Sequence, residues 1–246
     1  MSEPVRLHFI GSGDAFGNGG RFQTCFWLEG AAESVLIDCG ATSLTALKAA
    51  GVEPNDIACV VLTHLHGDHF GGLPFFVLDG QFRRRELPLM IAGPPGTRER
   101  VEAAMDLLFP GSRNARRRFE ITFIELAERQ ATAMGPALVT TIPVEQPDTP
   151  ACALRIEYGG RVVAYSGDTA WTDELIELAT DADLFVAEAY FFDRQVPFHL
   201  DYATVLAHRD RLQCQRVVLT HMSPEMLARQ DEAALECAYD GMIVAL

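Results

Sequence analysis

Three histidines and one aspartate lie within six positions directly behind the apolar run 58–62, in the segment His64-Leu65-His66-Gly67-Asp68-His69. The apolar run predicts a buried strand, and a strand that ends in such a segment aims several side chains at one point. Imidazole nitrogen and carboxylate oxygen are the ligands that first-row metals accept where thiolates are absent. His64 and His66 are expected to face the same way. Asp68 and His69 follow a bend at Gly67 and reach the same cavity from another side, where a second metal ion can bind.

Two further polar residues stand directly behind apolar strands. Asp168 follows the apolar run 162–165, and His221 follows the run 217–220, where Leu219-Thr220-His221 repeats the pattern of Leu62-Thr63-His64. Ligand sites of α/β proteins collect at the carboxyl ends of strands. With the first segment these two residues complete a set for two metal ions, in which the Asp168 carboxylate can bridge both.

Hydrophobic periodicity predicts strands mixed with helices along the whole chain, which favours a layered α/β architecture. Helices are expected at 43–50, at 173–180 behind a Thr172 cap, and from Ser223-Pro224 onward. The strands are expected near 5–11, 24–29, 34–38, 58–63, 87–92, 119–126, 137–144, 152–157, 161–166, 184–187, 216–220 and 242–245.

The two halves of the chain follow one plan. Residues 25–39 read as a hairpin that is followed by a helix and the strand leading to His64, and residues 152–168 read as a hairpin followed by a helix and the strand 184–187. This repeat predicts two similar sheets that meet face to face, with strand ends from both contributing to one site.

Composition restricts the class of protein. No linker divides the 246 residues, so one domain over 1–246 is expected. The first residues lack the pattern of an export signal and no apolar run approaches the length of a membrane span, so we expect a cytoplasmic protein that does not enter a membrane. Six cysteines without a CxxC pair suggest reduced core thiols.

The formal charge of −14 disfavours long nucleic acid and favours a small molecule as the substrate. Two basic runs, 83–85 and 116–118, either guide an anionic substrate to the site or form solvated faces and internal ion pairs, which is the commoner use of such runs.

Several motifs together carry a resemblance to the metallo-β-lactamase fold superfamily, and within it to the ribonuclease Z and phosphodiesterase branch. They are Gly11-Ser12-Gly13, Leu36-Ile37-Asp38-Cys39-Gly40, the HxHxDH segment, Gly71-Gly72-Leu73-Pro74, Ser166-Gly167-Asp168-Thr169, His199 and Leu219-Thr220-His221. The resemblance implies an α/β fold of the four-layer αββα sandwich type, a homodimer, and usually two zinc ions (Zn2+), with Mn2+ or iron as alternatives.

Carried over residue by residue, the resemblance assigns His64 and His66 to a first metal ion and Asp68, His69 and His221 to a second, with Asp168 as the bridge. One position departs from the family pattern. The chain has Gln146 where the family has another histidine for the first ion, and Glu145 and Cys152 are alternative ligands there. Either one or two ions are therefore expected.

The resulting hypothesis is a metal-dependent hydrolase that acts on a small phosphodiester through metal-activated water. Asp68 would orient the water, and His199 would assist the leaving oxygen or else be an ordinary histidine at the start of a helix. Asp38 is expected to orient a ligand histidine. The alternatives are a metallo-hydrolase of a lactone, thioester or other ester, and a non-catalytic protein that binds a metal or a ligand through a degenerate first site.

Overall fold

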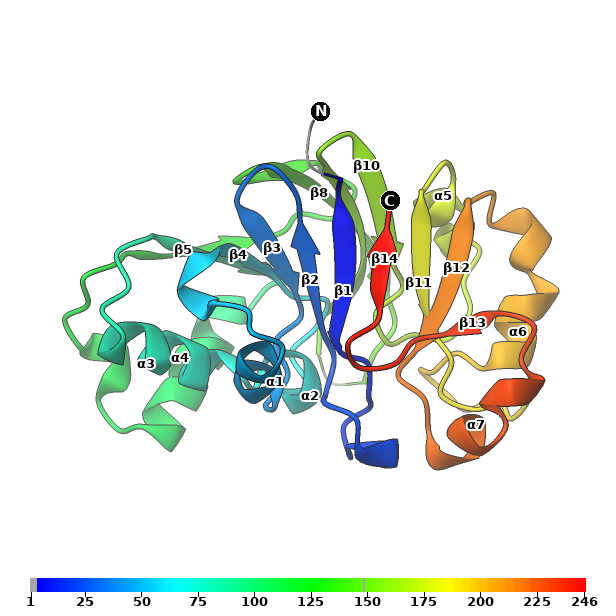
Figure 1. Ribbon diagram of the computed structural model, residues 1–246, viewed down its shortest axis with the longest axis horizontal. Coiled ribbons are helices and arrows are strands. Elements are labelled where there is room, and N and C mark those ends of the chain that lie inside the picture. Colours follow the sequence, from blue (N-terminus) through cyan, green and yellow to red (C-terminus); the bar gives the residue numbers. More distant parts are fainter. Residues whose placement is uncertain (1–3, 148) are drawn as a thin grey trace.

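Two seven-stranded sheets face each other in the computed structural model, which describes residues 4–147 and 149–246 (Figure 1). Residues 1–3, part of the segment in which we expect no export signal, lie outside this description. The first sheet has the order β14-β1-β2-β3-β4-β5-β6, with β1 Arg6–Gly11, β2 Cys25–Glu29, β3 Ser34–Ile37, β4 Ile57–Val61, β5 Leu89–Gly93, β6 Ile121–Glu125 and β14 Ile243–Ala245.

The second sheet repeats this arrangement. Its order is β13-β12-β11-β10-β9-β8-β7, with β7 Thr132–Met134, β8 Ala137–Val144, β9 Ala151–Tyr158, β10 Arg161–Tyr165, β11 Leu184–Glu188, β12 Arg216–Thr220 and β13 Glu236–Cys237. In each half an antiparallel hairpin (β2–β3, β9–β10) is followed by a parallel strand (β4, β11). The predicted internal repeat is therefore confirmed.

Helices cover the outer faces of both sheets, so the four-layer sandwich is confirmed. Helices α1 Ser43–Ala49, α3 Leu73–Phe82 and α4 Thr97–Leu108 share a buried cluster with the first sheet. Helices α5 Glu174–Ala179, α6 Tyr202–Ala207 and α7 Pro224–Ala228 share one with the second sheet. The short α2 Gly67–Phe70 carries the histidine segment, and single 3-10 turns occupy Asn18–Gly20, Pro54–Asp56, Ser112–Asn114, Arg209–Arg211 and Gln230–Glu232.

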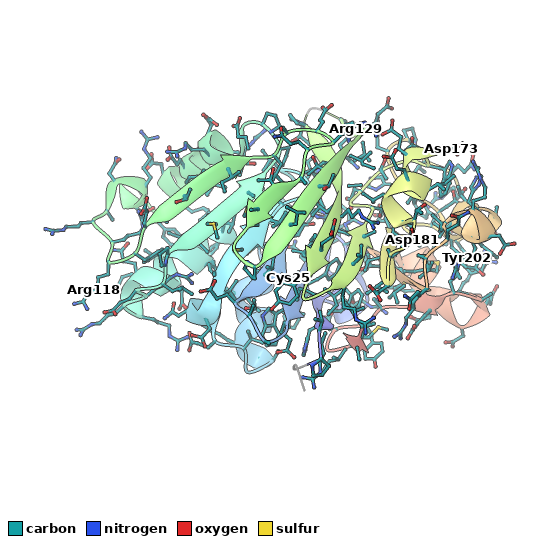
Figure 2. All side chains as sticks on the ribbon, turned by 90° about the horizontal axis from the view of Figure 1, so that it is seen from above. Cys25, Arg118, Arg129, Asp173, Asp181 and Tyr202 are labelled. Atoms are coloured by element: carbon teal, nitrogen blue, oxygen red, sulfur yellow. The ribbon has the colours of Figure 1, made fainter. Side chains whose placement is uncertain are left out.

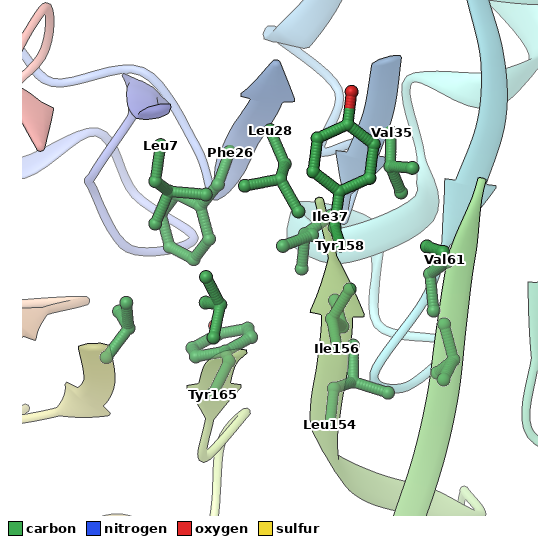
Figure 3. Close-up of a cluster of buried hydrophobic side chains, with 14 of the residues drawn as sticks. Leu7, Phe26, Leu28, Val35, Ile37, Val61, Leu154, Ile156, Tyr158 and Tyr165 are labelled. Carbon is green, nitrogen blue, oxygen red and sulfur yellow. The ribbon is translucent and has the colours of Figure 1, made fainter. Parts of the chain in front are cut away.

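The largest buried cluster lies between the sheets and fixes how they face each other (Figure 3). Phe26 of β2 meets Tyr165 of β10 edge to face, with ring centroids 5.1 Å apart. Leu28 of the first sheet and Leu154 of the second are fully buried in the same layer. Each such side chain contributes about 1.5–3 kcal/mol by leaving water. This shared layer brings the carboxyl ends of strands from both sheets to one edge of the molecule.

The structure departs from the predicted elements in small ways. Strands β7 and β13 were not predicted because they have only three and two residues. Helix α5 begins at Glu174, and its N-cap residue is Asp173 rather than the predicted Thr172. Helix α7 begins as predicted, since the Ser223 side chain accepts a hydrogen bond from the Met226 N–H. Within the described residues, no helix combines the length and the apolar character needed to cross a membrane.

Candidate metal centre

The ends of four strands converge at one edge, the lower edge in Figure 1, where α2 and α7 follow them. Strand β4 leads to the segment from His64 to His69, which belongs to the first sheet. Asp168 follows β10, Glu188 ends β11 and His221 follows β12, all in the second sheet. The site is thus assembled from both halves of the repeat, as the sequence predicted.

Special backbone geometry places these side chains. Asp38 and His221 both adopt a left-handed backbone, with φ of 56° and 58°, which costs about 1–3 kcal/mol per residue and is maintained only where surrounding contacts enforce it. A Cβ atom at Gly40 would lie 2.2 Å from the carbonyl oxygen of Asp68. Only glycine at this position allows the loop after β3 to pack directly on the backbone of α2.

Asp68, His69, Asp168 and His221 form a buried cluster in which one potential ligand atom from each residue lies within 4.8 Å of the others. Nε2 of His221 lies 3.2 Å from Oδ2 of Asp68 and 3.5 Å from Oδ2 of Asp168. Nε2 of His69 lies 3.3 Å and 3.4 Å from the same two oxygens. The residues predicted for the second metal ion are therefore brought together around a common centre.

This cluster contains buried polar atoms without partners. Among the described residues, Nε2 of His69, Oδ1 of Asp168 and Nδ1 of His221 are enclosed and accept or donate no hydrogen bond. Each unsatisfied polar group of this kind costs about 1–3 kcal/mol. Nδ1 of His221 faces Oε1 of Glu188 at 3.4 Å, whereas Nε2 of His69 faces the carboxylates of the cluster. A divalent cation with nitrogen and oxygen ligands would satisfy Nε2 of His69 and Oδ1 of Asp168, so the donor set fits the metal ion that the sequence predicts.

The electrostatics of the cluster also favour a cation. Burial alone would raise the pKa values of Asp68 and Asp168, but the neighbouring His69 and His221 outweigh burial and lower both. Burial would lower the pKa values of His69 and His221, but the nearby carboxylates outweigh it and raise both. Asp68 and Asp168 are therefore ionised inside the protein, and nearby positive charge stabilises them. Protons on the histidines or a bound metal ion can supply that charge.

Hydrogen bonds behind the cluster orient its imidazoles. Oδ2 of Asp38 lies 2.8 Å from Nδ1 of His69, which leaves Nε2 facing the cluster. Asp38 also accepts hydrogen bonds from the N–H and hydroxyl of Thr63. The Thr63 hydroxyl in turn contacts Nδ1 of His64 at 3.1 Å. Such partners fix the tautomer and ring orientation of metal-binding histidines.

His64 and His66 point toward each other beside this cluster, with 3.0 Å between Nε2 of His64 and Nδ1 of His66. Nε2 of His64 lies 3.9 Å from Oδ2 of Asp168. Burial and the neighbouring His69 lower the pKa of His64 well below its usual value, which favours the neutral imidazole that binds metals.

The three candidates for the missing histidine differ in the structure. The amide nitrogen of Gln146 donates to the Phe198 carbonyl at 2.9 Å, and its amide oxygen is buried without a hydrogen-bond partner among the described residues. Glu145 is exposed. Cys152 directs its thiol at the Thr63 carbonyl, 3.3 Å away, and burial raises its pKa, so it is not a thiolate ligand. Gln146 is thus the candidate with a free, enclosed oxygen.

Sequence reasoning missed Glu188, which holds His199. Oε1 of the fully buried Glu188 lies 2.5 Å from Nδ1 of His199, and Oε2 accepts hydrogen bonds from the N–H groups of Thr169 and Leu200. Burial lowers the pKa of His199, but the Glu188 contact outweighs it and raises that pKa. The available signal was the position of Glu188, a carboxylate at the end of an apolar strand between the strands of Asp168 and His221.

A second group of residues, Asp168, Glu188, His199 and His221, also brings its potential ligand atoms within 4.8 Å. Both oxygens of Glu188 are already engaged by protein donors. The group of Asp68, His69, Asp168 and His221 therefore fits a metal ion better than this second group does. His199 lies beside the first group, and its ring is partly exposed.

Two cavities lie beside this centre, one on each side of Ala170 and Trp171. A cavity of about 250 Å³ is lined by Ala170, Trp171, Gln195, Val196, His199, Leu200, Asp201 and Thr204. A cavity of about 450 Å³ is lined by Pro143, Val144, Glu145, Thr169, Ala170, Trp171, Thr172 and Glu174. The smaller cavity is lined by His199, the histidine that stands at the side of the cluster.

Arginines of the two basic runs are used within the structure. The buried Arg85 donates to the carbonyl groups of Pro54 and Ile57, and Arg83 pairs with Glu53 at 2.6 Å. Arg117 donates to the backbone of 112–115.

All six cysteines are free, as predicted.

Known proteins are similar to this chain in sequence or in fold. A family model described as anti-Pycsar protein Apyc1 matches residues 5–238. The ribonuclease Z of Mycobacterium bovis (strain BCG / Pasteur 1173P2) is 30% identical over 254 aligned positions, which cover 93% of this chain and 89% of the mycobacterial one. The metallo-β-lactamase fold protein YhfI from Bacillus subtilis superposes with a TM-score of 0.81 at 20% identity, over 98% of this chain and 99% of that one. Human tRNase Z, short form, superposes with a TM-score of 0.80 at 23% identity, over 98% of each chain.

The solved structures confirm the predicted fold, and the family model and the sequence relative confirm the predicted branch. Together with the buried histidine and aspartate cluster, they make this protein a metallo-hydrolase of the phosphodiesterase type. The chain belongs to the Apyc1 family, in the ribonuclease Z-like branch of the metallo-β-lactamase fold.

Proposed function

We propose that this protein hydrolyses a small phosphodiester, and that its substrate is a cyclic nucleotide. The observation that carries the proposal is the placement of the Glu188–His199 pair directly beside a buried cluster in which, among the described residues, Nε2 of His69 and Oδ1 of Asp168 have no hydrogen-bond partner. A proton donor at the side of a metal centre is what cleavage of a phosphodiester with an alkoxide leaving group needs.

The ligands of the second ion would be Asp68, His69 and His221, and Asp168 would bridge to the first. His64 and His66 would hold the first ion, with the free amide oxygen of Gln146 as the third ligand. The nitrogen and oxygen donors suit Zn2+, and Mn2+ or iron can occupy similar sites. Bound ions would supply an activated water and Lewis-acid stabilisation of charge on the phosphoryl oxygens.

Two side chains of the protein then act, one on the attacking water and one on the leaving oxygen. The second carboxylate oxygen of Asp68 would orient the attacking water. Protonated His199 donates its Nε2 proton to the leaving oxygen, because its Nδ1 is engaged by Glu188. The buried carboxylate of Glu188 stabilises the positive imidazolium before the proton is transferred.

Three features support a small substrate over a long RNA. The net charge of −14 repels a polyanion over most of the surface. The cavity that touches His199 has a volume of about 250 Å³. The arginines at 83, 85 and 117 are engaged within the protein rather than spread along an open groove. Membership of the Apyc1 family favours a cyclic nucleotide among small phosphodiesters.

The test is a substrate panel with zinc-loaded protein and its Asp68→Asn variant. The panel contains 3′,5′-cyclic nucleotides of all four bases, bis-p-nitrophenyl phosphate, a precursor tRNA and a γ-lactone. We expect the cyclic nucleotides to be converted to monophosphates with the highest kcat/KM and the variant to be inactive on them. The proposal is lost if the lactone or the tRNA is the better substrate, or if the variant matches the native protein on the cyclic nucleotides.

A further inference from the structure

Trp171 stands three residues after the candidate ligand Asp168 and borders both cavities beside the centre. Its side chain is only partly buried. A large aromatic ring held at the mouth of a site is costly to expose and is commonly found where a ligand ring stacks.

The indole of Trp171 is held in one orientation by three other side chains. Its Nε1–H donates to Oδ1 of Asp173 at 3.1 Å. The His208 imidazole stacks on it, with centroids 4.0 Å apart and an angle of 9° between the rings. Arg211 joins these two supports, since it donates to Oδ2 of Asp173 at 2.8 Å and contacts Nδ1 of His208 at 3.1 Å.

This support lies at the surface, where ion pairs contribute about 0–1 kcal/mol to stability. The side chains of Asp173 and Arg211 are 68% and 47% exposed. Asp173 and the start of α6 lie at the same end of the molecule (Figures 1 and 2). The main effect of the group is therefore to fix the Trp171 ring. His208 covers one face of the ring, and the remainder of the indole is left to border the cavities.

The smaller cavity has the chemistry of a site for a flat, partly polar ring. Val196 and Leu200 are apolar residues that line this cavity together with Trp171. The Gln195 amide nitrogen donates to the Thr204 hydroxyl at 3.2 Å, which leaves its amide oxygen for a ligand. Each carboxylate oxygen of Asp201 accepts a hydrogen bond from Thr204, one from its N–H and one from its hydroxyl.

The larger cavity is less suited to the same ligand. It is bounded by Glu145 and Glu174, and the second of these pairs with Arg129 at 2.7 Å. His199 borders only the smaller cavity of the two. A molecule with its phosphate at the metal centre and its leaving oxygen at His199 therefore extends into the smaller one.

We propose that the cavity between Trp171 and Val196 is the subsite for the nucleobase of the substrate, with the base stacked on Trp171 and an N–H of the base donating to Gln195. This inference rests on the proposed function, because it takes the nucleotide as the substrate class. It makes Trp171 a specificity-determining residue and gives Asp173, His208 and Arg211 the role of positioning its ring.

Binding of reaction products tests the subsite without turnover. Trp27 and Trp171 are the two tryptophans of the chain, so the Trp27→Phe variant has Trp171 as its single tryptophan, which is excited at a wavelength that tyrosine does not absorb. The zinc-loaded variant is titrated with cytidine 5′-monophosphate and with ribose 5-phosphate, which lacks the base. We expect the nucleotide alone to quench the Trp171 emission. Equal quenching by both compounds, or by neither, overturns the subsite.

Calorimetric titration of Trp171→Ala measures the energetic contribution of the ring. Stacking on an aromatic side chain is worth about 1–3 kcal/mol per base, which predicts that Kd for the nucleotide rises by roughly 5- to 150-fold. Kd for ribose 5-phosphate stays unchanged, and Trp171→Phe retains most of the affinity. Phe82→Ala, which removes an exposed aromatic ring on α3, is the matched control and leaves both constants unchanged. Equal losses for the two ligands, or no loss, contradict the proposal.

The result is separable from the proposed function. If the nucleotide binds in a Trp171-dependent way while no cyclic nucleotide is hydrolysed, the subsite stands and the proposed reaction falls. If cyclic nucleotides are hydrolysed and Trp171→Ala leaves their KM unchanged, the reaction stands and the subsite falls. Support for both is a KM that rises for cyclic nucleotides only, with kcat nearly unchanged, in a variant whose thermal unfolding matches the native protein.

Discussion

Oε1 of Glu188 lies 2.5 Å from Nδ1 of His199. Glu188 is the last residue of β11, which lies in the sheet between the strands that lead to Asp168 and His221. The carboxylate is fully buried, while the imidazole is partly exposed toward the cavity. A buried anion behind an accessible imidazole keeps the proton on the imidazole at a pH where a free histidine has lost it. His199 is therefore an acid whose pKa is set by the buried carboxylate of Glu188.

Replacing Glu188 by Gln should move the pH profile of the enzyme. The raised pKa of His199 means that its protonated form persists to higher pH than in a free histidine. Removing the negative charge lowers this pKa, so the alkaline limb of kcat/KM shifts to lower pH. The profile is measured from pH 5 to 10 with a cyclic nucleotide, and zinc content is measured in parallel. An unshifted alkaline limb at unchanged zinc content contradicts the assigned role of the pair.

Replacing His199 by Ala should affect substrates according to their leaving group. A ribose alkoxide needs a proton as it departs, and general acid catalysis contributes about 10² to 10⁴-fold to such a step. The p-nitrophenolate ion leaves without a proton. We therefore expect a loss in that range for a cyclic nucleotide and a loss under about tenfold for bis-p-nitrophenyl phosphate. His8→Ala, at a histidine on β1 that contacts Glu29, is the control on both substrates. Equal losses on both substrates for His199→Ala would indicate a structural role.

The sequence predicted the parts of the site that follow directly from strand ends. His64, Asp168 and His221 each stand behind an apolar strand, and the repeat of hairpin, helix and strand placed those strands in two facing sheets. Both the sheets and the meeting of these residues could be inferred without coordinates, because parallel strands present their carboxyl ends at one edge.

The strand-end rule also marks Glu188, but neither its contact with His199 nor the orientation of Trp171 could be found in this way. The contact of Glu188 with His199 depends on a loop of ten residues that returns to the site with a left-handed backbone at Phe198, where φ is 67°. The orientation of Trp171 depends on His208 and Arg211, which lie nearly forty residues away in the sequence. Contacts of this kind are set by tertiary packing rather than by local periodicity.

The number of metal ions per chain tests the role of Gln146. We expect about two zinc ions per chain by elemental analysis of protein purified without added metal or chelator, because the Gln146 amide oxygen is enclosed and free. Gln146→Ala should lower the value toward one, and Gln146→His, with a stronger ligand, should keep it at two with tighter binding. A native value near one would mean that only the site of Asp68, His69, Asp168 and His221 is filled. In that case the two-ion arrangement is wrong.

Removal of the metal should lower the stability of the folded protein, because the buried atoms of His69 and Asp168 lose the partner that satisfies them. A ligand that binds only the folded state adds about 4 kcal/mol when present at a thousand times its Kd. Dialysis against a chelator should therefore lower Tm by several degrees, and zinc should restore it. The control is Asp168→Asn, in which the amide replaces the bridging carboxylate. Its Tm should respond less to zinc than that of the native protein. A native Tm that is the same with chelator and with zinc would show that the cluster binds no metal in the folded state, and the hydrolase assignment would lose its physical basis.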